Sequence, residues 1–195
     1  MSRILLWRHG LTGYNAEGRI QGQFDAPLAD EGLRQAEKAA ELLAALAPTR
    51  IVSSDLSRAR RTAEVLGART GLSVEPDTRL RERHFGEWQG RTHAELAAHD
   101  AERYDAWRNG RHVAVPGSES TTECGVRTAA ALTEIASGEG PIVVVSHGGS
   151  IRYGLEEFLG APGLSRVLRG LENCHWADVR PRGGRWVLHA YNVGA

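Results

Sequence analysis

The sequence is poor in cysteine and contains no long hydrophobic run. Its 195 residues include two cysteines, Cys124 and Cys174, which lie far apart and outside any Cys-x-x-Cys or Cys/His spacing. A disulfide framework and a zinc site are therefore not expected, and we predict buried free thiols in a reducing compartment. No segment approaches the ~20 apolar residues of a membrane-spanning helix. The N-terminal apolar run is too short for a signal peptide, so we expect a cytoplasmic protein.

The chain also lacks a net charge. It carries 24 basic and 24 acidic side chains, which gives a formal net charge of +0. This balance provides no electrostatic basis for general binding to nucleic acid or to an anionic membrane, so we expect neither as a partner. Arginine supplies almost all of the positive charge, because Lys38 is the only lysine. Any anion binding must therefore come from the local placement of arginines.

The hydrophobic pattern predicts strands that alternate with helices. Strands are predicted at residues 4–7, 50–54, 73–75, 141–146, 175–180 and 185–190, with a hairpin turn at 181–184. Helices are predicted at residues 31–46, 55–70, 92–109 (one or two short helices), 120–138 and 151–159. The alternation indicates an α/β fold of three layers, with a mainly parallel central sheet and helices on both faces. We find no internal repeat or linker and expect one domain over residues 1–195.

Cap residues mark several helix ends. Asp30 is a candidate N-cap for the helix at 31–46, and Gly71 is a candidate C-cap for the helix at 55–70. Thr92 and Glu95 have the spacing of a capping box, which predicts a helix start at that point.

Three loops follow the three best strands, and all three are rich in groups that bind anions. They are Arg8-His9-Gly10, Ser53-Ser54-Asp55 with Arg58, and Ser146-His147-Gly148-Gly149. Parallel strands end at one edge of a sheet, so we expect these loops to converge. Glycine turns and helix N-termini favour anions, and the planar fork of arginine suits phosphate oxygens. Each residue alone has an ordinary explanation: His147 as a hydrogen-bonded structural residue, Arg58 as a surface residue, and Glu82 as part of a solvated charged loop.

The motifs, in this order, resemble the histidine phosphatase superfamily. The resemblance rests on Arg-His-Gly after the first strand, the run Ser-Asp-Leu-Ser-Arg-Ala-Arg-Arg-Thr-Ala, Glu82 followed by Gly-Glu-Trp-Gln-Gly, and the late Ser-His-Gly-Gly. It covers residues 5–192 and implies the phosphoglycerate mutase-like fold. The stretch at 79–94 is most similar to that of glucosyl-3-phosphoglycerate phosphatases and broad-specificity phosphatases.

The resemblance implies a covalent mechanism with two central residues. His9 is expected to attack phosphorus and become a phosphohistidine. Glu82 is expected to protonate the leaving alkoxide and then to act as base on the water that hydrolyses the intermediate, so we expect its carboxyl to be partly desolvated. Neither a metal nor another cofactor is expected, because arginine and histidine supply the positive charge.

The resemblance also implies which residues surround the substrate. The residues expected to hold the phosphate are Arg8, Asn15, Arg58, His147 and the Gly148 backbone N–H. The residues expected at the pocket mouth are Gln21, Gly22, His84, Phe85 and Trp88. His84 and Trp88 fit equally well as packing residues under their loop. Protonation of His147 is opposed by the two arginines, and a bound phosphate dianion favours it.

The same residues distinguish a phosphatase from three other kinds of protein. A phosphoglycerate mutase would need a grip on a second anionic group, and the short region at 90–116 has four arginines but no adjacent pair, which favours a phosphatase. A non-catalytic binding module would lack His9 or Glu82, and both are present. A dinucleotide-binding protein would carry Gly-x-Gly-x-x-Gly after its first strand, and none occurs.

The nature of the substrate and of any partner is less defined. The expected substrate is a small phosphorylated metabolite, either a phosphoglycerate-type ester or a sugar phosphate. The C-terminal aromatics Trp176, Trp186 and Tyr191 fit either a sheet edge or the face of a homodimer.

Overall fold

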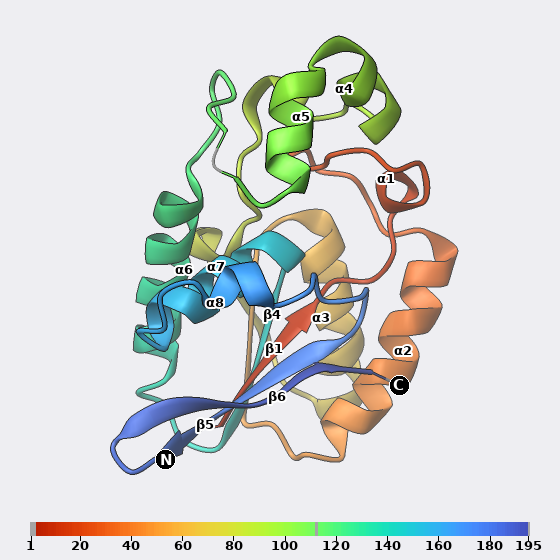
Figure 1. Ribbon diagram of the computed structural model, residues 1–195. Coiled ribbons are helices and arrows are strands. Elements are labelled where there is room, and N and C mark those ends of the chain that lie inside the picture. The colour runs from red at the N-terminus through yellow and green to blue at the C-terminus, as the bar shows by residue number, and fades with distance from the viewer. Residues whose placement is uncertain (1–2, 112, 195) are drawn as a thin grey trace.

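Six strands form one sheet in the computed structural model, which describes residues 3–111 and 113–194 (Figure 1). The strands are β1 (Arg3–Arg8), β2 (Arg50–Ser53), β3 (Val74–Pro76), β4 (Pro141–Ser146), β5 (Trp176–Arg182) and β6 (Arg185–Val193). Their order across the sheet is β3-β2-β4-β1-β5-β6. The prediction of a single domain over residues 1–195 stays a prediction.

The sheet is mainly parallel, as the sequence predicts. β4 lies between β1 and β2 and is parallel to both, and β2 is parallel to β3. β5 is antiparallel to β1, and β6 is antiparallel to β5. The register pairs Arg8 with Ser146 and Ser53 with Val145, so β1, β2 and β4 end at the same edge. The loops that follow them are thereby brought together.

Helices cover both faces of the sheet (Figure 1). They are α1 (Gly13–Ala16), α2 (Asp30–Ala44), α3 (Ser57–Thr70), α4 (His93–His99), α5 (Ala101–Arg108), α6 (Thr121–Ile135), α7 (Gly148–Phe158) and α8 (Leu164–Val167). Two 3₁₀ turns, η1 (Thr78–Leu80) and η2 (Gly86–Trp88), lie between β3 and α4. No helix in the described residues is both long enough and apolar enough to cross a membrane.

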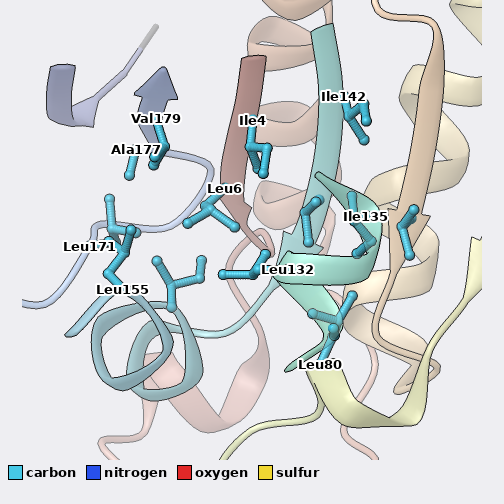
Figure 2. Packing of buried hydrophobic residues seen from close by; sticks show 14 residues of the cluster. Ile4, Leu6, Leu80, Leu132, Ile135, Ile142, Leu155, Leu171, Ala177 and Val179 are labelled. Carbon is cyan, nitrogen blue, oxygen red and sulfur yellow. The ribbon is translucent and has the colours of Figure 1, made fainter. Parts of the chain in front are cut away.

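The two faces of the sheet are packed by side chains that alternate along each strand, as strand geometry requires. Leu5 and Trp7 of β1 face the buried side chains of α2 and α3. Ile4 and Leu6 face the opposite layer, where Leu132 of α6 packs against them (Figure 2). Each of these side chains is at most 1% exposed. Burying one such side chain contributes about 1.5–3 kcal/mol, so the two layers together hold the sheet edge in place.

A small separate core lies above the carboxyl edge of the sheet, under α4 and α5 (Figure 1). We call residues 84–111 and 113–118 the cap. Trp88, Leu96 and Tyr104 are buried in it, and the indole N–H of Trp88 donates to Asp100 at 2.9 Å. The cap therefore covers the edge where the three predicted loops meet.

Several element ends differ from the sequence predictions. The predicted N-cap role of Asp30 is wrong: Ala29 is the N-cap, and Asp30 is the first helical residue. There its negative charge still favours the helix N-terminus. α7 begins at Gly148 instead of residue 151, which makes His147 its N-cap. The capping box of Thr92 and Glu95 is confirmed, and so are the left-handed C-cap at Gly71 and the two buried free cysteines.

Candidate active site

His9 follows β1 directly and is only 3% exposed. Its Nδ1 lies 2.7 Å from the backbone oxygen of Gly10. Because a carbonyl oxygen only accepts, we assign the ring proton to Nδ1 and the lone pair to Nε2. Burial, together with the guanidinium groups of Arg58 and Arg8, holds the pKa of His9 well below its usual value. The ring is therefore neutral at physiological pH, and Nε2 carries a free lone pair.

The backbone around His9 is held by contacts to three other elements. The His9 N–H donates to the Ser146 oxygen of β4 at 3.1 Å. The next N–H, at Gly10, donates to the Thr62 hydroxyl of α3 at 3.1 Å. A side chain at Gly10 would run into the backbone of Gly32 at the start of α2. The glycines at these two positions therefore allow the loop to pass close against α2, which fixes the imidazole.

Arg58 lies in the first turn of α3 and is fully buried. Its two terminal nitrogens donate to the backbone oxygens of Phe24 (2.8 Å) and Gly22 (2.7 Å). Burial lowers the pKa of Arg58 to about 10, so it is still a cation at neutral pH. Its Nε is buried and has no hydrogen-bond partner.

Two further buried donors beside His9 have no partner. Arg8, whose Nη1 donates to the Leu171 backbone oxygen, leaves its Nε unpaired. The His147 ring lies with its centroid 5.1 Å from that of His9 and leaves Nδ1 unpaired. Buried polar atoms are nearly always hydrogen-bonded, so Arg8, Arg58 and His147 together form an arrangement that suits an anion.

His147 is oriented by Ser54, at the end of β2. The Ser54 hydroxyl lies 2.9 Å from Nε2 of His147 and itself accepts from the Leu56 N–H at 3.3 Å. Because the Ser54 hydroxyl has no other acceptor among the described residues, we assign it as donor to Nε2, which puts the His147 proton on Nδ1. Burial, with Arg58, His9 and Arg8 nearby, holds the pKa of His147 well below its usual value. Both arginines act in the direction that the sequence predicts, against protonation of His147.

Glu82 is fixed at the N-terminus of α7. Its carboxylate accepts from the Gly149 N–H (3.0 Å), the Ser150 N–H (3.0 Å) and the Arg83 N–H (2.8 Å). The Ser150 hydroxyl, which donates to the Arg81 backbone oxygen at 2.6 Å, lies 3.2 Å from the same carboxylate. Glu82 is half-buried, as its expected partial desolvation requires. Its charge is the one that acts most strongly on Arg8 and Arg58. The structure therefore brings Glu82 to the same site.

Asn15 and Gly148 border the same group of anion-binding side chains. The amide oxygen of Asn15 accepts from the Thr12 N–H (3.2 Å) and hydroxyl (3.0 Å), which leaves its nitrogen to donate to a ligand. A Cβ at Gly148 would lie 3.5 Å from Nε of Arg8, so the first residue of α7 packs on that guanidinium. Asn173 donates to the His9 backbone oxygen at 3.0 Å and closes the site from the other side.

Four of the residues predicted at the pocket mouth fall into two pairs. Gln21 is buried and its side-chain oxygen lies 3.0 Å from the Thr12 hydroxyl, and Gly22 supports Arg58. His84 and Phe85 are engaged within the cap. The His84 Nδ1 lies 2.9 Å from the Gly117 oxygen, and the Phe85 ring meets Trp107 edge-on at 6.1 Å. Contact of these residues with a substrate stays a prediction.

Several residues that support the site are missed by reasoning from the sequence. Ser54 and Thr62 lie inside a motif and Ser150 directly follows one, but none of them receives a role there, and Asn173 carries no local signal. Their contacts join residues 52 to 164 positions apart. Such contacts depend on packing, and no spacing in the sequence encodes them.

The family comparison agrees with this site. In it, a neutral histidine lies at the carboxyl edge of a parallel sheet, among arginines and a second histidine. The chain belongs to the histidine phosphatase superfamily (branch 1), whose sequence model matches residues 4–194. It is a phosphatase, in the class of phosphoric monoester hydrolases. The family, fold and enzyme class predicted from the sequence are confirmed.

Named relatives are similar over nearly the full length. The chain is 40% identical to a glucosyl-3-phosphoglycerate phosphatase of Mycolicibacterium vanbaalenii, over 99% of this chain and 95% of the relative. It is 35% identical to a probable phosphoglycerate mutase of Salmonella paratyphi C, over 99% and 91%. The solved structure of a mycobacterial glucosyl-3-phosphoglycerate phosphatase with VO3 superposes with a TM-score of 0.92 at 40% identity, over 98% of this chain and 99% of that one.

Proposed function

We propose that this protein hydrolyses a small phosphorylated metabolite through a phosphohistidine on His9. The supporting observation is that three buried N–H donors without partners, on Arg8, Arg58 and His147, surround a neutral imidazole. A phosphoryl group bound there would direct its equatorial oxygens at these donors and its phosphorus at Nε2. Phosphoryl transfer depends on this kind of positioning and charge stabilisation.

The proposed reaction has two steps that restore the enzyme. First, the Nε2 lone pair of His9 forms a bond to phosphorus, the P–O ester bond breaks, and the protonated Glu82 gives its proton to the departing alkoxide. Second, the Glu82 carboxylate takes a proton from water, the water oxygen attacks phosphorus, and the N–P bond breaks. The products are the alcohol and orthophosphate, and Glu82 is again protonated.

The names of the relatives suggest a phosphoglycerate-type ester as substrate. We propose glucosyl-3-phosphoglycerate as the first ester to assay, because relatives at about 40% identity are named for it. A mutase is the second candidate, because a 35% identical relative is named as a probable phosphoglycerate mutase. Orthophosphate release without isomerisation of 3-phosphoglycerate would support the phosphatase, whereas isomerisation would support the mutase.

Replacing the nucleophile tests the mechanism. His9→Ala should lower orthophosphate release by on the order of 10⁴-fold, because no other group takes over the covalent step. It should also abolish the acid-labile phosphoenzyme, measured with a ³²P-labelled ester after a denaturing quench in SDS at alkaline pH, where phosphohistidine is stable. The exposed His99, on α4, provides a control, and His99→Ala should retain both signals. Turnover retained in His9→Ala would rule out the assignment.

Replacing the acid tests the second role. Glu82→Gln should lower kcat/KM for alkyl phosphates by about 10²-fold or more, because the alkoxide then leaves without a proton. The loss for p-nitrophenyl phosphate should be much smaller, since nitrophenolate needs no proton. The parameter kcat/KM is suitable because it includes only the steps up to departure of the alcohol. Equal losses for both esters would contradict the acid role.

A further inference from the structure

Side chains hold the chain segment that carries Glu82. Glu82 lies between the turns η1 and η2, outside any helix or strand of the described residues. A buried backbone oxygen without a partner is costly, so such a segment must find partners elsewhere. The backbone oxygens of residues 79–82 all accept hydrogen bonds from side chains. These side chains therefore determine where the Glu82 carboxyl lies.

Arg127, on α6, binds three of these four oxygens. Its Nη1 donates to the backbone oxygens of Arg79 and Arg81, at 2.7 Å each. Its Nη2 donates to the backbone oxygen of Glu82 at 3.0 Å. One guanidinium therefore fixes the backbone at Glu82 and over the three residues that precede it.

Glu119, two residues before α6, orients this guanidinium. Its carboxylate accepts from Nε (2.6 Å) and Nη2 (2.8 Å) of Arg127, which is a bidentate pair. The same carboxylate accepts from the His84 N–H at 3.2 Å, and the Glu119 N–H donates to the His84 oxygen at 2.9 Å. The Glu119 backbone oxygen accepts from Nε of Arg83 at 2.7 Å. Arg127 and Glu119 together therefore hold the chain on both sides of Glu82.

Stability alone does not account for this arrangement. The side chains of Arg127 and Glu119 are only 21% and 16% exposed, and a buried ion pair adds little stability beyond that of apolar residues. Among the described residues, none of the Arg127 hydrogen bonds goes to His9, Arg58 or His147. Any effect of Arg127 on the reaction must therefore pass through the Glu82 segment. Its planar fork of five donors suits several acceptors at fixed positions, which the single ammonium of a lysine does not.

We propose that Arg127, oriented by Glu119, is a positioning residue that holds the Glu82 carboxyl within reach of the leaving oxygen. The inference rests on the proposed function, in which Glu82 protonates the departing alkoxide. A misplacement of about 1 Å in a reacting group can cost about 10²-fold in rate. Loss of Arg127 should therefore impair esters whose alcohol leaves with a proton and largely spare esters whose alcohol leaves without one.

Two esters with different leaving groups test this inference. Arg127→Met should lower kcat/KM for glycerol 3-phosphate by about 10²-fold and kcat/KM for p-nitrophenyl phosphate by less than about fivefold. The retained p-nitrophenyl phosphate activity also shows that the variant is folded. Arg127→Lys should give a similar selective loss. Arg79→Gln is the matched control, because Arg79 lies in the same segment and pairs with Asp77 and Glu134, and it should keep the native ratio of the two kcat/KM values.

A double variant shows whether Arg127 acts through Glu82. In the Glu82→Gln protein there is no acid left to position, so adding Arg127→Met should lower kcat/KM for glycerol 3-phosphate by less than about threefold. A residue that supports only the fold or phosphate binding would cost the same in both backgrounds. Equal losses in the native and the Glu82→Gln backgrounds would therefore overturn the inference.

The failure of this inference can be separated from failure of the proposed function. If Arg127→Met does not fold, Arg127→Lys and Glu119→Gln take its place, and Glu119→Gln should lower kcat/KM for glycerol 3-phosphate selectively by about tenfold. A selective loss in Glu82→Gln, with none in the variants of Arg127 and Glu119, would overturn this inference and leave the acid role standing. Equal losses for both esters in Glu82→Gln would overturn the acid role and this inference with it.

Discussion

The position of the Glu82 carboxylate depends on a single glycine, Gly149, in the first turn of α7. The N–H of Gly149 donates to Glu82 at 3.0 Å, and a Cβ built on Gly149 would lie 2.5 Å from Oε1 of the same carboxylate. No real Cβ contact is that short, so any side chain here must displace Glu82. The space around Gly149 is therefore part of the site.

Gly149→Ala should act like a mild loss of the catalytic acid. We expect kcat/KM for alkyl phosphates to fall by about 10²-fold, with a smaller loss for p-nitrophenyl phosphate, because the displaced carboxyl no longer reaches the leaving oxygen. Steady-state kinetics with both esters measures this. Gly170→Ala is the control, because a Cβ there meets nothing within 4 Å. If Gly149→Ala retained native kcat/KM for alkyl esters, Glu82 would not need its present position.

At the level of elements, α7 carries the largest share of the site. His147 is its N-cap, and its first N–H groups hold Glu82. The helix is held against α6 at two glycines, Gly125 and Gly154, where added side chains would meet the neighbouring helix. A Cβ on Gly154 would lie 2.5 Å from Cγ2 of the buried Thr128. Close approach of the two helices therefore sets where the site residues lie.

Gly154→Ala should destabilise the protein, although helix propensity alone predicts the opposite. Replacing a helical glycine by alanine favours folding by about 1 kcal/mol where there is room. Here the overlap with Thr128 should reverse the sign and lower the free energy of unfolding by about 1–3 kcal/mol. Urea unfolding measures this change. Combining it with Thr128→Ser, which removes Cγ2 but keeps the hydroxyl, should recover part of the loss, and an additive double variant would contradict the overlap.

At the scale of the whole molecule, the site reduces stability in mild acid. The pKa values of His9 and His147 are well below normal in the folded chain, whereas in the unfolded chain they return to about 6.5. Below that pH the unfolded chain binds protons that the folded chain does not. The free energy of unfolding therefore falls as the pH falls from about 6.5 toward the folded-state pKa values.

Removing one of the two histidines should weaken this pH dependence. Between pH 6.5 and 5.5, each buried neutral histidine should account for a loss of about 1 kcal/mol in the free energy of unfolding. His147→Gln should therefore lose about 1 kcal/mol less than the native chain over this range. Urea unfolding at pH 7.5, 6.5 and 5.5 gives the comparison, in a range above the titration of most carboxyl groups. Identical losses would show that His147 is not held neutral in the folded chain.

The sequence by itself determined the strand and helix alternation, the parallel sheet and the residues that meet at the candidate site. These features are readable because they are local: the apolar periodicity of β1 and β4, the capping box at Thr92, and the loops that directly follow strands. The shortest helices could not be predicted from the sequence. α1 and α8 have four residues each, too few for a periodic pattern or for stability on their own.

Only the tertiary structure decided how those residues work together. Ser54 orients His147 across 93 positions, and α7 holds Glu82 across 67 and 68 positions. The physical reason is that a hydrogen bond or a buried charge depends on distance in space, whereas propensity and periodicity act between near neighbours along the chain.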